Sequence, residues 1–136
     1  MSGSRTNDDL PIVLVGAGGH ARVLLGLLQQ LGREVLGVCD PELASLGQPH
    51  WEGLPVLGDD SYFMAAPVGS IALVNGVGFV PGAYQRMHVQ KRMERAEHIQ
   101  PSLCHPQAFV DPSADIAAGA QIMAGAIIQP CAKIGQ

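Results

Sequence analysis

The sequence predicts an α/β fold in which an open parallel sheet is followed by the start of a β-helix of hexapeptide repeats. Three observations carry this prediction. A glycine-rich turn joins an apolar run to a helical stripe within residues 12–31, strand-like and helix-like segments alternate up to residue 97, and aliphatic residues recur every sixth position from residue 110.

The composition limits the classes of function. The chain has 136 residues, of which 47% are hydrophobic and 15% charged, with a net charge of −4. This balance predicts no general affinity for nucleic acids or anionic membranes. No apolar run is long enough to span a membrane, and residues 1–10 lack the order of a signal peptide. We therefore expect a flexible tail at residues 1–10, no membrane insertion and a cytoplasmic location.

The first strand and helix flank the glycine-rich turn. Residues 12–15 are β-branched and apolar, as in a buried strand. A helical stripe follows, and Gly32 stands where a glycine commonly ends a helix. The stripe consists of Leu24, Leu27, Leu28 and Leu31.

Further segments continue the alternation. A second strand is predicted over residues 34–39, a loop with a short strand at 54–57 over residues 41–58, and a third strand over residues 70–74. Pro81 suits the first turn of a helix that reaches about residue 97. This order predicts a parallel sheet with helical crossovers.

The glycine-rich turn matches the pattern G-x-G-x-x-A through Gly16, Gly18 and Ala21. Such a turn lets the backbone approach a phosphate, which the helix N-terminus then binds. Asp40 ends the second strand, where a carboxylate can accept hydrogen bonds from ribose hydroxyls. The pattern predicts nucleotide binding; the alternative is a tight turn without a ligand.

Several polar residues near this turn have two interpretations. His20 either contacts phosphate or sugar, or satisfies backbone groups at the helix end. Asn75 and Gly76 follow the third strand, so they either line a pocket at the carboxyl edge of the sheet or form a turn. The basic residues on the helix over residues 81–97 fit a solvated face better than a phosphate or CoA patch.

The second half carries a repeat of six residues. Period six with an aliphatic anchor and a small fifth residue is typical of a β-helix, in which each hexad forms one flat face of a triangular coil. The chain reaches Gln136 in the middle of a hexad, so we expect it to be the front part of a longer protein. The anchors are Val110, Ile116, Ile122, Ile128 and Ile134, and the small residues are Ala108, Ala114, Ala120, Ala126 and Ala132.

The segments "VGAGGHARV", "HPQAFVDPSADI" and "AQIMAGAIIQPCAKIG" together resemble one family of sugar O- and N-acyltransferases, of the sialic acid O-acetyltransferase and bacillosamine-precursor N-acetyltransferase type. The resemblance implies a Rossmann-like domain at residues 11–103 that binds a nucleotide-linked sugar. It also implies a left-handed β-helix from residues 104–136 onward, a homotrimer, and acetyl-CoA bound between subunits.

The resemblance also implies roles for single residues. Gly16, Gly18, Gly19, His20, Asp40 and Asn75 fall on the acceptor side of the family's site. In the family a histidine acts as general base on the acceptor, and backbone N–H groups stabilise the oxyanion. In the family that histidine lies in a short motif one coil after the segment that matches "GAIIQPCAKIG", a position beyond Gln136 here, whereas His105 matches a structural His-Pro at the domain junction. We therefore assign no catalytic residue to these 136 residues and expect them to be inactive alone.

The cysteines give no sign of a metal site. Cys39, Cys104 and Cys131 lack the spacing of zinc ligands, so we expect three reduced, buried thiols and no bound metal.

The function predicted is acetyl-CoA-dependent acyl transfer to an amine or hydroxyl of a nucleotide-linked sugar, with this chain supplying the acceptor-binding domain. Two alternatives are an NAD-linked oxidoreductase domain, suggested by the glycine pattern and Asp40, and a non-catalytic module that binds nucleotide-sugars. The hexads count against the oxidoreductase. The acceptor sugar, its nucleotide and the choice between O- and N-acylation stay open.

Overall fold

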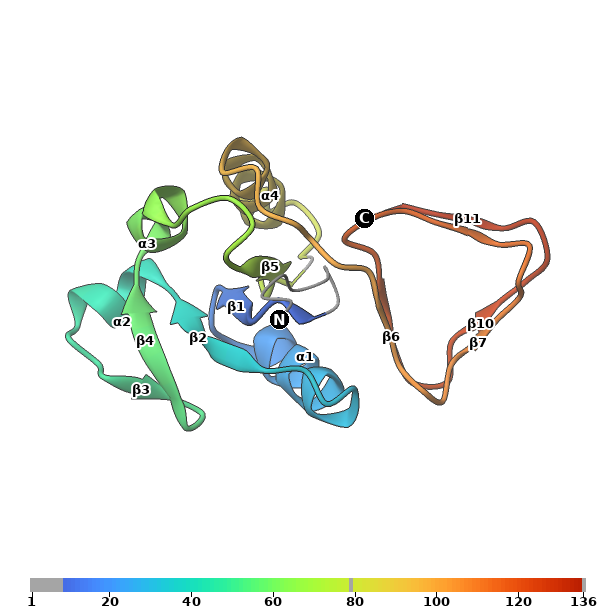
Figure 1. The fold of residues 1–136 in the computed structure, drawn as a ribbon, viewed down its shortest axis with the longest axis horizontal. Helices are drawn as coiled ribbons and strands as arrows, with labels where there is room; N and C mark the ends of the chain where they lie inside the picture. Colours follow the sequence, from blue (N-terminus) through green and yellow to red (C-terminus); the bar gives the residue numbers. More distant parts are fainter. Residues whose placement is uncertain (1–8, 79, 136) are drawn as a thin grey trace, which may run out of the picture.

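A computed structural model describes residues 9–78 and 80–135 of the chain. The N-terminal part contains a sheet and four helices, and the C-terminal part winds into a triangular coil (Figure 1). The elements of the first part are β1 (Ile12–Val15), α1 (Gly19–Gln30), β2 (Val35–Cys39), α2 (Pro41–Ser45), β3 (His50–Trp51), β4 (Leu54–Gly58), α3 (Asp60–Ala65), β5 (Ala72–Asn75) and α4 (Gln85–Arg95).

The sheet has the strand order β3-β4-β2-β1-β5. The pairs of β1 with β2, β1 with β5 and β2 with β4 are parallel, which confirms the predicted open parallel sheet. The exception is the edge hairpin of β3 and β4, which is antiparallel. Its turn holds Glu52 and Gly53 at φ of 49° and 79°, as tight two-residue hairpin turns require.

Helices cover both faces of the sheet, so β1 lies in the middle of three layers (Figure 1). One face packs against the leucines of α1, and the other packs against Phe63 of α3 and Val89 and Met93 of α4. All four residues of β1 are buried. This explains why the strand is uniformly apolar rather than alternating.

Helix α1 ends as the sequence predicts. Leu31 is the C-cap, and Gly32 follows in the left-handed region at φ 67°. The N–H of Gly32 donates to Gln29 O (3.1 Å), and that of Arg33 donates to Leu28 O (3.0 Å). These two bonds form the Schellman motif, which satisfies carbonyl groups at the helix end.

Two local predictions were wrong, and one helix was missed. The loop predicted over residues 41–58 contains α2, whose first turn is capped by the Asp40 carboxylate accepting from Leu43 N (2.9 Å), and also β3. Helix α3 was not predicted. Helix α4 begins at Gln85 rather than Pro81, because Gly82 adopts a left-handed φ of 81° that interrupts a helix.

The coil consists of β6 (Leu103–Cys104), β7 (Phe109–Val110), β8 (Asp115–Ile116), β9 (Gln121–Ile122), β10 (Ile127–Ile128) and β11 (Lys133–Ile134). Its parallel pairs are β6 with β9, β7 with β10 and β8 with β11. Each of the first three strands therefore pairs with the strand three hexads later, as a triangular coil of one hexad per face requires (Figure 1). The predicted β-helix of hexapeptide repeats is confirmed.

The corners of the coil require a special backbone. Gly119, Gly125 and Cys131 occupy the same place in successive hexads, with φ of 78°, 78° and 61°. A non-glycine residue in the left-handed region is uncommon, so Cys131 holds a strained corner.

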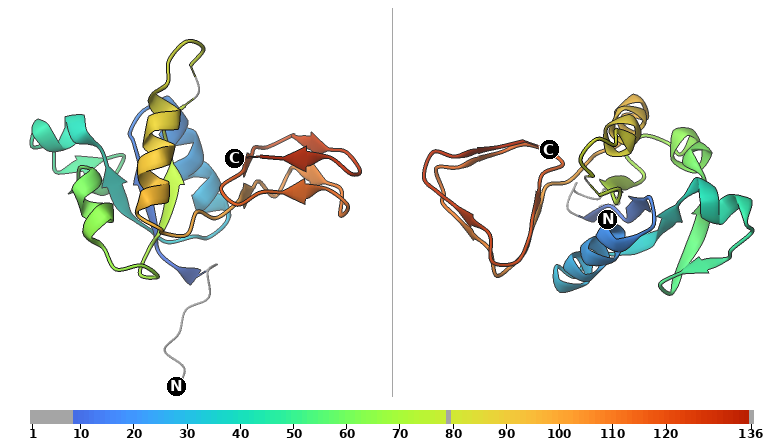
Figure 2. Two further views of the ribbon diagram at one scale, coloured as in Figure 1. Left: turned by 90° about the horizontal axis from the view of Figure 1, so that it is seen from above. Right: turned by 180° about the vertical axis from the view of Figure 1, so that it is seen from behind.

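The residues that precede the anchors point out of the coil and give each face a distinct surface. On β6 and β9 these are Leu103, which joins the α1 core, and Gln121. On β7 and β10 they are Phe109 and Ile127, which are 58% and 66% exposed. On β8 and β11 they are the exposed Asp115 and Lys133. The coil therefore lies beside the sheet part and touches it with one face (Figure 2).

Some sequence-based expectations concern burial. Residues 1–8 of the expected tail lie outside the described residues, whereas Leu10 is buried in the α1 core. Cys39 is buried, but Cys104 and Cys131 are exposed, so the prediction of three buried thiols was wrong for the two cysteines of the coil. Among the described residues, no helix is long and apolar enough to cross a membrane.

Candidate functional site

A cavity of about 350 Å³ opens at the carboxyl edge of the sheet. The ends of β1 and β2, the start of α1, the loop after β5 and one side of α4 form its walls. Gly18 and Asp40 both line it, as expected for open α/β sheets, which bind ligands at this edge. The lining residues used below are Gly16, Gly18, Gly19, His20, Cys39, Asp40, Asp60, Gly76, Gly78 and Arg92.

The fold requires glycine at the first position of the turn but not at the two later positions. Gly16 adopts φ 93°, and a Cβ there would lie 2.8 Å from Cγ2 of Val77, so the fold itself requires glycine. Gly18 is extended, and a Cβ on Gly18 or Gly19 would meet nothing within 4 Å. The fold therefore tolerates side chains at these two positions, and only a ligand in the cavity would exclude them.

Helix α1 presents its N-terminus at this cavity. Among the described residues, no side chain caps the helix, and its first turn contains no acidic residue. Its first N–H groups and the positive end of its dipole are therefore available to an anion.

Asn75 and Gly76 serve the structure of the cavity wall. Asn75 is only 3% exposed; its amide oxygen accepts from Val77 N (3.0 Å), and its amide nitrogen donates to Gln90 Oε1 (3.2 Å). The structure does not place Asn75 among the lining residues. Gly76 does line the cavity, and a Cβ there would lie 2.9 Å from Gly16 O.

His20 connects the cavity to the coil. Its Nε2 lies 2.8 Å from Oε1 of Gln121 on β9. The amide nitrogen of Gln121 in turn donates to the backbone oxygen of Asn75 (3.1 Å). The sequence analysis missed Gln121, because the repeat shows that it points outward but not which face of the coil meets the sheet.

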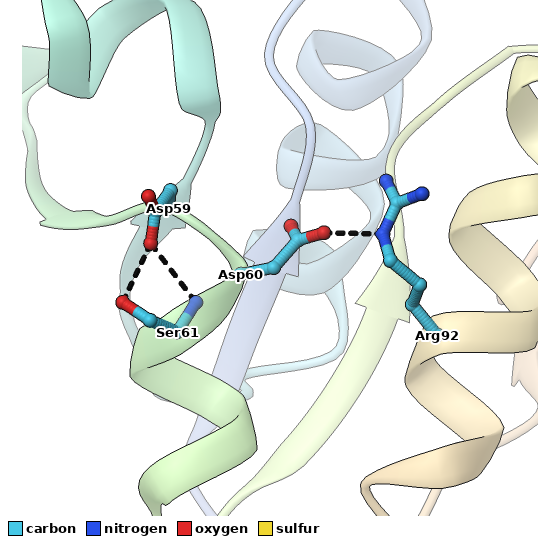
Figure 3. A network of polar contacts seen from close by, with 4 residues as sticks. All are labelled: Asp59, Asp60, Ser61 and Arg92. Atoms are coloured by element: carbon cyan, nitrogen blue, oxygen red, sulfur yellow. Dashed lines mark hydrogen bonds and ion pairs between the residues drawn. The ribbon is translucent and has the colours of Figure 1, made fainter.

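An ion pair missed by the sequence analysis stands at another side of the cavity (Figure 3). Arg92 of α4 donates from Nε to Asp60 at the start of α3. Their side chains are 41% and 23% exposed, so both groups remain accessible to a ligand. The prediction that the basic residues of this helix form only a solvated face was wrong for Arg92, which lines the cavity. It was correct for Lys91 and Arg95, which are exposed.

Arg86 is the second exception in the basic run. It donates to the backbone oxygens of Val77 and Asn75, and so fastens the loop after β5 to α4. Partial burial lowers the pKa of its guanidinium. Arg86 therefore has a structural role beside the cavity and is not among the residues that line it.

The charges around Asp60 also act on Cys39. Burial raises the pKa of the Cys39 thiol to about 12, with smaller contributions from the carboxylates of Asp60 and Asp59. Asp59 caps α3 by accepting from the backbone and hydroxyl of Ser61, and these bonds lower the pKa of Asp59 (Figure 3). A thiol with so high a pKa is a poor nucleophile, so Cys39 belongs to the core.

The other histidines lie away from the cavity. His50 and His88 are exposed, and His98 is buried with Nε2 on the backbone oxygen of Phe63 (2.6 Å). The Nδ1 of His105 accepts from Gln107 N (3.0 Å) within its own turn. Within residues 9–78 and 80–135, no group of three or more potential metal ligands is found.

Comparison with known proteins adds independent information. Residues 11–79 match the family model of the PglD N-terminal domain. The chain is also similar to PerB from Caulobacter crescentus, solved in complex with CoA and GDP-perosamine, with 26% identity and a TM-score of 0.76. The comparison covers 93% of this chain and 57% of PerB.

A second similar structure is the acetyltransferase domain of PglB from Neisseria gonorrhoeae in complex with acetyl coenzyme A. It shares 26% identity at a TM-score of 0.78, over 92% of this chain and 58% of that domain. The chain thus spans less than two thirds of the length of these relatives. None of the curated proteins compared with it matches.

Proposed function

Because this chain belongs to the PglD N-terminal domain family, we propose that it supplies the acceptor-binding part of a sugar acetyltransferase. The enzyme would transfer an acetyl group from acetyl-CoA to an amine or hydroxyl of a nucleotide-linked sugar. The observation that carries the proposal is the cavity at the carboxyl edge of the sheet, where an uncapped helix N-terminus meets the glycine turn.

The cavity offers a place for each part of such an acceptor. The N-terminus of α1 and the open backbone at Gly18 and Gly19 suit the diphosphate. Asp40 caps α2 through Oδ2, which leaves Oδ1 to accept from a ribose hydroxyl. Asp60 and Arg92 together offer an acceptor and donors to a nucleobase. The sugar then extends toward His20 and the coil.

The chemistry of the proposal is direct transfer. The acceptor nitrogen or oxygen attacks the thioester carbonyl of acetyl-CoA, the carbon–sulfur bond breaks, and the acceptor's proton passes to a general base. We assign neither the base nor a contact with acetyl-CoA to a residue of this chain. The residues described here bind and orient the acceptor.

The coil supports a proposal about assembly. Phe109 and Ile127 form an exposed apolar pair on the β7 and β10 face. We propose that this face is covered in a left-handed β-helical homotrimer of the longer protein. The boundary between the acceptor-binding domain and the β-helix is proposed at residues 103 and 104.

The test is a binding experiment with matched variants. Titration calorimetry should show binding of GDP-perosamine or a UDP-sugar and none of NAD. Arg92→Met should weaken nucleotide-sugar binding about ten- to a hundredfold, because hydrogen bonds to charged groups contribute about 1.5–3 kcal/mol. Lys91→Met, one residue away on the exposed side of α4, is the control and should change nothing. Binding of NAD in place of nucleotide-sugars would revive the oxidoreductase alternative.

A further inference from the structure

We infer that Gln121 is a positioning residue that holds His20 in its Nε2–H form, so that Nδ1 is left to accept a hydrogen bond from the acceptor sugar. This inference rests on the proposed function for the identity of the ligand. The hydrogen bonds that carry it are independent of that function, because they lie within the chain itself.

The orientation of the Gln121 amide follows from its two partners. The backbone oxygen of Asn75 can only accept a hydrogen bond, so the amide atom 3.1 Å away must be the NH₂ group. The other amide atom, Oε1, is then the one that lies 2.8 Å from the imidazole of His20. An amide oxygen can only accept, so Nε2 of His20 must carry a proton.

This bond settles the tautomer of the neutral imidazole. With the proton on Nε2, the Nδ1 atom holds a lone pair, and no described residue forms a hydrogen bond with it. His20 lines the cavity, and the loop after β5 lies against it, since a Cβ on Gly78 would lie 3.2 Å from Cβ of His20. A ligand group that meets Nδ1 must therefore be a donor, such as a hydroxyl or an amine.

The backbone that presents Gln121 is firmly held. Its neighbours Ala120 and Ile122 are 0% and 4% exposed. Their carbonyl oxygens accept from Leu103 N (2.7 Å) and His105 N (2.8 Å) of the preceding coil. Because Gln121 stands on a paired, buried strand, it can fix the imidazole more firmly than a loop residue could.

The direct test uses nuclear magnetic resonance of the full chain with ¹⁵N-labelled histidine. The His20 signals, assigned with His20→Gln, should show the Nε2–H tautomer in the parent at neutral pH. Gln121→Met removes both polar atoms at similar size and should give a mixture of tautomers. Gln129→Met, an exposed position in the coil, is the control. A parent spectrum with the proton on Nδ1, or an unchanged spectrum in Gln121→Met, would overturn the inference.

The ligand test uses GDP-perosamine as the probe. Gln121→Met should lower its affinity about tenfold, whereas Gln129→Met should leave the affinity unchanged. Loss of the tautomer in Gln121→Met without loss of affinity would overturn the role toward the sugar. If the parent chain itself does not bind the probe, the proposed function fails, while the spectra still decide whether Gln121 positions His20.

Discussion

The sheet and the coil are both built mainly on parallel strands, but they bury their side chains to different degrees. Every residue of β1 and β5 is buried. Among the described residues of the coil, only Leu103, Ala120 and Ile122 are buried, and all three belong to the β6 and β9 face that meets the sheet part or to its corner. The anchors on the other faces are half-buried.

The difference shows where each part obtains its stability. The sheet lies between two layers of helices within this chain, so its core is closed on both faces. A coil of a β-helix is covered mainly by the coils stacked on it. Its anchors are therefore buried by the neighbouring coils rather than by residues of their own hexad. Perturbing equivalent residues in the two parts should therefore have unequal effects.

The largest effect is expected from matched isoleucine deletions. Ile12→Ala should lower the free energy of unfolding by about 4 kcal/mol, because Ile12 is 0% exposed in the centre of the sheet. Ile128→Ala should cost about 1 kcal/mol, since its side chain is only partly buried. Urea unfolding followed by circular dichroism measures both. Equal losses would show that the coil is packed as tightly as the sheet.

Two glycines at the site should separate folding from binding. Gly76→Val should destabilise the chain by about 3 kcal/mol, because its Cβ would lie 3.0 Å or less from Gly16 O and Val15 O. Gly18→Val meets open space and should leave the thermal midpoint almost unchanged, yet abolish nucleotide-sugar binding. Calorimetry on both variants provides the measurement. A Gly18→Val variant that binds as tightly as the parent would make the glycine turn purely structural.

Labelling of the cysteine thiols should show the same difference in burial between the sheet and the coil. At pH 8 a thiol reagent should modify Cys104 and Cys131 but not Cys39, and urea should expose the third site; mass spectrometry counts the labels. The raised pKa of Cys39 also makes the free energy of unfolding depend on pH. Its contribution is fully present below pH 9 and is lost as the pH rises toward about 12, because only the unfolded thiol ionises in that window. Early labelling of Cys39 would indicate local opening of β2.

The smallest effect concerns one turn that occurs in both parts. Asp59 and Asp111 each accept from the serine two residues later, and these bonds lower the pKa of each carboxyl. Their stabilisation is present above the ordinary pKa of 3.8 and is lost as the pH falls through the lowered value. Asp59→Asn and Asp111→Asn should each slightly reduce the difference in melting temperature between pH 7 and pH 3. A difference that does not change in either variant would show that these exposed turns contribute nothing.

Local sequence patterns predicted the features that depend on local chemistry. These features are the strand at residues 12–15, the glycine that ends α1, and the hexads. Each is visible in the spacing of apolar residues or in a residue type that suits one backbone conformation. Helices α2 and α3 have only five and six residues, too few to show a helical period, and their caps, Asp40 and Asp59, also resemble ordinary turn residues. The sequence therefore could not distinguish them from loops.

The candidate site was predictable in its backbone but not in its side-chain partners. The turn and Asp40 meet because strands of a parallel sheet end at one edge. Arg92, Asp60 and Gln121 come from three further elements, and their contacts depend on how α3, α4 and the coil pack. No spacing along the chain encodes such contacts, so Arg92 looked like its exposed neighbours.

The pairing of each coil strand with the strand three hexads later sets a rule for insertions and deletions. Adding one hexad before residue 121 would keep every later anchor inside, but would rotate every later outward side chain to the next side of the triangle. Adding three hexads would return each side chain to its own side, displaced by one strand spacing of about 4.8 Å along the axis. Gln121 would then stand at the wrong height for His20, so the length of chain between the two parts is itself a determinant of the site.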